Sequence, residues 1–196
     1  SEEQTREWAA IWKFMRIGSV WTLADGTFRW IAVGIPFNLV DKAQPEGDID
    51  LMIAMTKIVR NSDGSTPILY RVFEVKTRKV DSTGAIKVLS ETKINKAIKQ
   101  LEKLRRIGAE QVFLLELYIA QAGYSMRENA AIPKKIVNSV ERIRERLNKT
   151  GYGYVLQFLE NIREYDEEMV GIEHKPFLIR PAQVFDIKKP LQDIVD

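Results

Sequence analysis

Apolar side chains recur every three or four residues in three segments of this chain, which is the spacing of one buried helix face. The predicted helices cover residues 2–17, 90–108 and 133–147. Ser90 is the expected N-cap of the second helix, Gly108 ends it, and Pro133 begins the third. Trp8 and Trp12 lie one turn apart in the first helix, so we expect them in the core in preference to stacking on bases.

Shorter runs rich in β-branched and aromatic residues predict strands. They cover Ser19–Leu23, Phe28–Val33, Asp48–Val59, Ile68–Thr77, Gln111–Ile119 and Tyr154–Leu159. Asp25-Gly26 is typical of a tight turn, residues 36–47 are expected to be irregular, and the polar segment 61–67 makes a hairpin of its flanking strands. Gly151-Tyr152-Gly153 is interpreted as a turn. The order helix, strands, helix, strand, helix, strand predicts an α/β domain with a mixed sheet.

Composition places the chain among ordinary globular proteins and excludes several kinds of site. Its 196 residues are 45% apolar and 29% charged, which fits one domain without a transmembrane helix. The polar start of the chain is unlike a secretory signal, so a cytoplasmic location is the expectation. No cysteine is present, and His174 is the single histidine, which excludes disulfides, thiolate metal sites and histidine pairs.

Positive charge is concentrated in residues 71–106. Eleven lysines and arginines stand there against four acids, a balance of +7, so that the rest of the chain carries −4 of the total +3. Such a concentration is expected where a protein binds a polyanion such as nucleic acid. A solvated helix face explains the same charges equally well, so charge alone does not decide.

Two carboxylates and a lysine stand at the ends of the predicted hairpin. Asp48 and Asp50 open its first strand, and Glu74 and Lys76 close its second. Residues two apart in a strand share a face, and antiparallel pairing brings the two ends together. Two carboxylates with water and phosphate oxygens suit Mg²⁺, and a neighbouring lysine supplies fixed positive charge for phosphodiester hydrolysis.

The Glu-x-Lys triplet is not specific by itself. The chain contains two others, Glu91-Thr92-Lys93 and Glu173-His174-Lys175, and only Glu74-Val75-Lys76 ends an apolar strand that follows another strand opened by acids. The alternative interpretation is an exposed ion pair on a hairpin surface, which stabilises a fold very little.

The segments Gly-Asp-Ile-Asp-Leu and Phe-Glu-Val-Lys resemble the second and third motifs of the PD-(D/E)XK, or restriction-endonuclease-like, nucleases, over roughly residues 2–119. The resemblance implies an αβββαβ core and Mg²⁺-dependent hydrolysis of DNA or RNA, with Mn²⁺ as a substitute metal. Asp50 and Glu74 are then the metal-binding and catalytic acids, Lys76 is the catalytic lysine, and Asp48 is at most a helper. Ile49 stands where the family name has proline, and the interval from Asp50 to Glu74 is long.

The resemblance also implies further site residues. A glutamate of the first helix is expected to join the site, with Glu7 the candidate and Glu3 the alternative. Gln100, beside the apolar stripe of the second helix, is the candidate for the polar site residue expected on the helix after the third strand. The alternative is that Gln100 is an ordinary exposed amide. The other flank of that helix is basic, and contacts to nucleic-acid phosphates are expected from six residues: Arg78, Lys79, Lys96, Lys99, Lys103 and Arg106.

A small chain with an extra helix and strand after the core is similar to Holliday junction resolvases. This similarity implies branched or duplex DNA as the partner and a homodimer, because two symmetric cuts need two active sites. We expect residues 1–160 to form the nuclease-like domain and residues 161–196 to form an extension packed on the core or on a dimer partner. The alternative function is a catalytically inactive nucleic-acid-binding module that keeps the fold.

Overall fold

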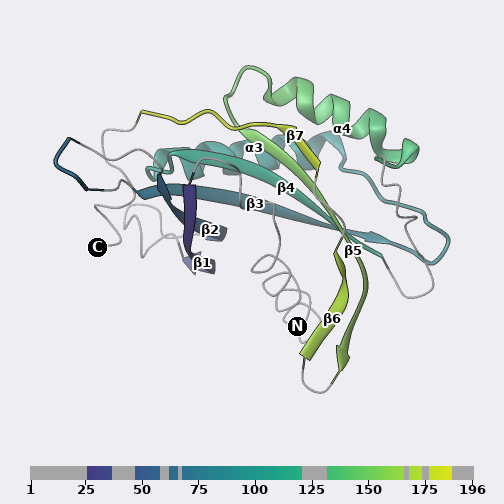
Figure 1. The fold of residues 1–196 in the computed structure, drawn as a ribbon. Helices are drawn as coiled ribbons and strands as arrows, with labels where there is room; N and C mark the ends of the chain where they lie inside the picture. The colour runs from purple at the N-terminus through teal and green to yellow at the C-terminus, as the bar shows by residue number, and fades with distance from the viewer. Residues whose placement is uncertain are drawn as a thin grey trace.

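A mixed β-sheet forms the centre of the molecule in the computed structural model (Figure 1). The structure describes residues 26–36, 47–57, 62–65, 68–120, 132–165, 168–173 and 177–186. The strands are β1 (Gly26–Pro36), β2 (Asp48–Lys57), β3 (Ile68–Val80), β4 (Gln111–Ala120), β5 (Gly153–Tyr165), β6 (Glu168–Glu173) and β7 (Phe177–Arg180). The order across the sheet is β1-β2-β3-β4-β5-β6, and β7 also pairs with β5.

The sheet changes from antiparallel to parallel at β3. β1, β2 and β3 form an antiparallel meander, and β3, β4 and β5 run parallel to one another. A parallel pair needs a long crossover, and the two crossovers contain α3 (Glu91–Arg106) and α4 (Lys134–Leu147). The predicted α/β class with a mixed sheet is therefore confirmed.

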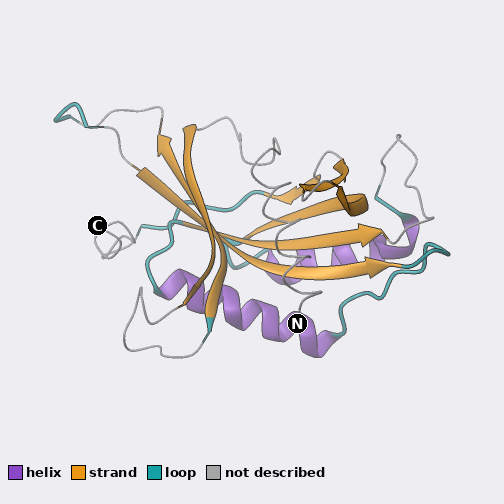
Figure 2. Ribbon diagram, turned by 90° about the horizontal axis from the view of Figure 1, so that it is seen from below, coloured by secondary structure: helices purple, strands orange, loops and turns teal. Residues whose placement is uncertain are grey.

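Both helices lie on one side of the sheet (Figures 1 and 2). Leu101 of α3 and Ile143 of α4 are fully buried in the same cluster as Val72 of β3 and Leu114 of β4. Strand residues alternate between faces, so the even-numbered positions of β3 and β4 point toward the helices. Polar residues at even positions on these strands therefore lie between the sheet and the helix layer.

The opposite face of the sheet is apolar as well. Leu51, Phe73, Phe113 and Val155 belong to a second buried cluster, and the rings of Phe73 and Phe113 stack with centroids 4.9 Å apart. Gly153 makes room for this stack, because a Cβ at that position would lie 2.2 Å from Cδ1 of Phe113. A strand buried on both faces is what the apolar run of β4 predicts.

The predicted hairpin, the helices over residues 90–108 and 133–147 and the two later core strands are confirmed, and β3 and β5 are longer than expected. β3 continues three residues past Thr77, and β5 continues to Tyr165. Ser90 caps α3 as predicted, accepting a hydrogen bond of 3.4 Å from the Lys93 amide. The predicted helix over residues 2–17 and the strand Ser19–Leu23 lie outside the described residues, as does nearly all of the loop 36–47.

The C-terminal part of the chain adds strands to the same sheet. The boundary expected at residue 160 falls inside β5, and both β6 and β7 pair with β5 in antiparallel fashion. The segment after β7 bonds back to the core, where the Phe185 amide donates to the Glu110 carbonyl over 2.8 Å. Neither described helix is long and apolar enough to cross a membrane.

Candidate functional site

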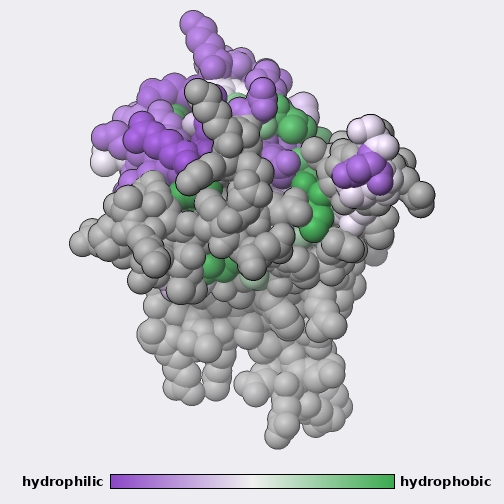
Figure 3. Space-filling model, turned by 90° about the vertical axis from the view of Figure 1, so that its left-hand side faces the viewer, coloured by the Kyte–Doolittle hydropathy of each residue, from purple (hydrophilic) through white to green (hydrophobic). Residues whose placement is uncertain are grey.

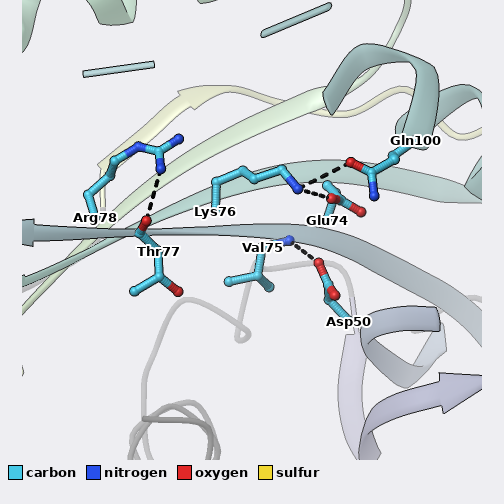
Figure 4. Close-up of polar contacts among 7 residues, drawn as sticks. All are labelled: Asp50, Glu74, Val75, Lys76, Thr77, Arg78 and Gln100. Atoms are coloured by element: carbon cyan, nitrogen blue, oxygen red, sulfur yellow. Dashed lines mark hydrogen bonds and ion pairs between the residues drawn. The ribbon is translucent and has the colours of Figure 1, made fainter. Parts of the chain in front are cut away.

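Asp50 and Glu74 lie side by side where the ladder between β2 and β3 ends. The last paired residues are Leu51 and Phe73, and Asp50 and Glu74 follow them on their respective strands. Beyond this pair, the Asp50 side chain takes the place of a backbone partner for β3. Its Oδ2 accepts a hydrogen bond of 2.7 Å from the Val75 amide (Figure 4). The hairpin thus brings the two carboxylates together, as the sequence pattern predicts.

Lys76 points to the same side of β3 as Glu74 and connects the strand to α3. Its ammonium donates to Glu74 Oε1 and, over 3.1 Å, to Gln100 Oε1 (Figure 4). Gln100 is held in place by α3, whose neighbouring residue Leu101 is buried in the core. The amide of Gln100 is therefore no ordinary exposed side chain, since it fixes the end of Lys76.

Both acids ionise at a higher pH than free carboxyl groups do. Burial raises the pKa of Asp50 above its ordinary value of 3.8, although the hydrogen bond from the Val75 amide and the charge of Lys76 lower it. Burial and the neighbouring charge of Asp50 raise the pKa of Glu74 to about 7, although the positive charge of Lys76 lowers it. A bound cation favours the ionised form of both carboxyl groups and reduces the repulsion between them, so this is a setting that attracts a cation.

The interpretation of Glu74 and Lys76 as an exposed surface ion pair is wrong. The Glu74 side chain is 3% exposed and that of Lys76 is 23% exposed. A carboxylate in this position loses most of its hydration, and it needs partners that an exposed pair does not need.

Other acids contribute less to the described site. Asp48 is exposed at the start of β2, and its charge raises the pKa of Asp50, so it lies in the neighbourhood. Glu7 and Glu3 lie outside the described residues, and so does His174. Within the described ranges, no group of three or more histidine, cysteine, aspartate or glutamate side chains is arranged to hold a metal ion.

One flank of α3 combines Gln100 with positive charge. Lys96 lowers the pKa of Glu74, so it faces the site together with Gln100. From the sequence we expected Lys96 on the flank opposite Gln100, and that placement is wrong. The opposite flank carries Glu91, which pairs with Arg142 of α4 at 3.1 Å. Lys99, Lys103 and Arg106 are also exposed on α3. Hydrophilic residues dominate the described surface over the two helices (Figure 3).

Arg78 and Lys79 do not belong to this basic flank. The Arg78 side chain is only 12% exposed, and its Nε lies 3.7 Å from Oε1 of the fully buried Glu116. Lys79 is exposed but follows Arg78 on the strand, so it points to the other face of the sheet. The expected phosphate contact of Arg78 stays a prediction, and in the structure its guanidinium faces the buried Glu116.

Glu116 is the polar residue that sequence reasoning missed. It appears in the sequence only as an interruption of an apolar run, yet in the structure its carboxylate accepts hydrogen bonds from the hydroxyls of Tyr118 and Tyr154. A lone acid inside a strand that is buried on both faces is a signal by itself, because buried carboxylates are paired.

Comparison with known proteins adds no family to this picture. No protein-family model matches the chain, and no curated protein matches its sequence. What the site does is therefore argued from its own chemistry.

Proposed function

We propose that the protein is a Mg²⁺-dependent nuclease with a PD-(D/E)XK core that hydrolyses phosphodiester bonds of DNA at Asp50, Glu74 and Lys76. One observation carries the proposal. The half-buried Asp50 and the buried Glu74, on adjacent strands, lie close enough for the charge of Asp50 to raise the pKa of Glu74, and the Lys76 ammonium contacts Glu74. An ion pair that serves only stability does not require the second acid.

The donor atoms suit a hard cation. Asp50 and Glu74 supply carboxylate oxygens, and Mg²⁺ completes its shell with water and substrate phosphate oxygens. The Val75 carbonyl lies on the same edge of β3 as the amide that binds Asp50, because both groups of one strand residue face the same neighbour. When bound, the ion supplies an activated water and neutralises charge on the phosphate.

Lys76 and Gln100 carry the part of the chemistry that belongs to the chain itself. The ammonium of Lys76 beside Glu74 orients the attacking water and stabilises the negative charge that develops on the phosphorane. Gln100 holds that ammonium by accepting its hydrogen bond of 3.1 Å. Fixing a charged group before the reaction avoids reorganisation during it.

The basic flank of α3 supports a polyanionic substrate. Lys96 lies near enough to Glu74 to affect its pKa, while the opposite flank is engaged with α4 through Glu91 and Arg142. Lys99, Lys103 and Arg106 extend the exposed positive charge along the helix. We assign these residues to backbone phosphates, which fix the position of a duplex without reading its sequence. Branched DNA and a homodimer, as in resolvases, complete the proposal.

Cleavage of a DNA panel tests the function. Linear, flapped and four-way DNA are incubated with Mg²⁺ and with wild-type protein, Lys76→Ala, or Lys149→Ala as a matched control that removes an exposed charge after α4. The proposal expects metal-dependent cleavage by the wild type and the control, and none by Lys76→Ala. Full activity of Lys76→Ala contradicts it.

The second candidate is a nucleic-acid-binding module without catalysis. It is favoured by the observation that the described site supplies two acids and no group of three. This candidate expects salt-sensitive binding of the same DNA with no cleavage in Mg²⁺ or Mn²⁺. Cleavage that disappears with Lys76→Ala eliminates it.

A further inference from the structure

A second buried carboxylate lies beside Lys76 and takes no part in the proposed chemistry. Glu116 of β4 is the register partner of Lys76 on the parallel strand β3 and is 0% exposed. Register partners on neighbouring strands share a face and lie about 4.8 Å apart, which is less than the length of a lysine side chain. Lys76 thus has two carboxylates within reach, Glu74 on its own strand and Glu116 on the next.

Two tyrosine hydroxyls supply part of the hydrogen bonding that the buried Glu116 carboxylate needs. Its Oε2 accepts hydrogen bonds from the Tyr154 hydroxyl and, over 3.3 Å, from the Tyr118 hydroxyl. Its Oε1 accepts no hydrogen bond within the described part of the chain. Two hydroxyl donors do not neutralise a buried carboxylate, so its ionised form also needs a positive charge nearby.

Arg78 supplies that charge. It lies two residues after Lys76 and on the same side of β3 (Figure 4). Its Nε is 3.7 Å from Glu116 Oε1. Its Nη1 donates to the Thr77 carbonyl over 2.9 Å, which holds the guanidinium against the strand. An arginine keeps its proton even when buried, so the charge opposite Glu116 is permanent.

We propose that Arg78 is a positioning residue for Lys76: by neutralising Glu116 it keeps the Lys76 ammonium on Glu74 and Gln100. Burial raises the pKa of Glu116 and Arg78 lowers it, so without Arg78 the carboxylate stays ionised only with another cation beside it. Lys76 is the register partner of Glu116 on the same face. The lysine then moves to Glu116 and leaves the site. The catalytic consequence rests on the proposed nuclease function, whereas the placement of Lys76 does not.

Three variants test this arrangement. Arg78→Met removes the cation, Glu116→Gln removes the competing charge, and the double variant removes both. In a crystal structure of Arg78→Met, we expect the Lys76 ammonium within hydrogen-bond distance of Glu116. In the double variant we expect it back on Glu74. Arg78→Lys, which keeps the charge, leaves Lys76 where it is in the wild type.

Cleavage of DNA in Mg²⁺ follows the same pattern. Displacement of a catalytic group by an ångström or more costs on the order of 100-fold in rate, so Arg78→Met loses about that factor and the double variant regains most of it. A purely structural or substrate-binding role of Arg78 predicts instead that the double variant is no better than the single one. That result overturns the proposal, as does a structure of Arg78→Met with Lys76 still on Glu74.

The outcomes separate this inference from the proposed function. If the wild type cleaves no DNA, the nuclease proposal fails, and the position of Lys76 in the variants still decides the role of Arg78. If Arg78→Met does not fold, the double variant decides alone, because it buries neither charge. Lys76 on Glu74 with wild-type cleavage supports the proposal, and a folded double variant with Lys76 displaced contradicts it.

Discussion

The raised pKa of Glu74 makes the stability of the metal-free protein depend on pH. The carboxyl titrates near 7 in the folded protein against an ordinary value of 4.5. Between these values the folded state binds a proton that the unfolded state has lost, so stability falls as pH rises. A difference of about 2.5 pKa units at roughly 1.36 kcal/mol each corresponds to about 3 kcal/mol, fully lost above pH 7.

Glu74→Gln removes this dependence. We expect the free energy of unfolding of the variant, relative to wild type, to increase by about 3 kcal/mol from pH 4 to pH 8. The assay is urea unfolding followed by circular dichroism in the presence of a chelator, at pH 4, 5, 6, 7 and 8. Glu102→Gln, on the exposed surface of α3, is the matched control for loss of one carboxyl. A wild-type minus variant difference that stays flat with pH, or changes in the other direction, refutes the reasoning.

Three further predictions concern the lysine, the basic flank and the core. Gln100→Ala removes a hydrogen bond to a charged group, worth roughly 1.5 kcal/mol, and lowers the single-turnover rate of cleavage about tenfold without weakening DNA binding; an unchanged rate counts against this role. Lys96→Ala and Lys103→Ala each reduce the salt dependence of DNA binding, lowering the slope of log K against log salt by about 0.9, and an unaltered slope shows that the residue contacts no phosphate. Gly153→Ala places a Cβ against Phe113 and destabilises the protein by about 2 kcal/mol in urea unfolding, whereas a neutral result means that the ring moves freely.

The elements that are visible in the sequence are those stabilised locally. The spacing of Ile94, Leu101 and Leu104 and the cap at Ser90 are sufficient to predict α3, and all of these apolar residues are buried. The hairpin of β2 and β3 follows from two apolar runs around a polar turn, and its antiparallel pairing is what brings Asp50 to Glu74. These parts of the fold and of the site need no information from distant residues.

The C-terminal strands depend on distant pairing and were not predicted. β5 has a register shift between Glu160 and Arg163, where its pairing with β6 is interrupted. β7 then pairs with the beginning of β5, with Arg180 opposite Tyr154. Strand preference depends strongly on such neighbours, so the polar sequence after residue 160 has no local pattern that identifies it as part of the sheet.

The ion pair of Arg78 and Glu116 shows the same limit within the site. The two residues are far apart in sequence, and only the parallel register of β3 and β4 places them on one face. Counting charges over residues 71–106 assigned Arg78 to a basic surface, whereas strand alternation places it with Lys76 and separates it from Lys79. A partner for Glu116 was required by its apolar surroundings, but its identity depends on the sheet.

Anomalous diffraction from crystals soaked in Mn²⁺ tests the central claim most directly, because it locates the ion without relying on activity. The account predicts one strong peak between Asp50 and Glu74, within coordination distance of both carboxylates, and no peak there in crystals of Glu74→Gln. Saturating Mn²⁺ that leaves the wild-type site between these two carboxylates without a peak contradicts it.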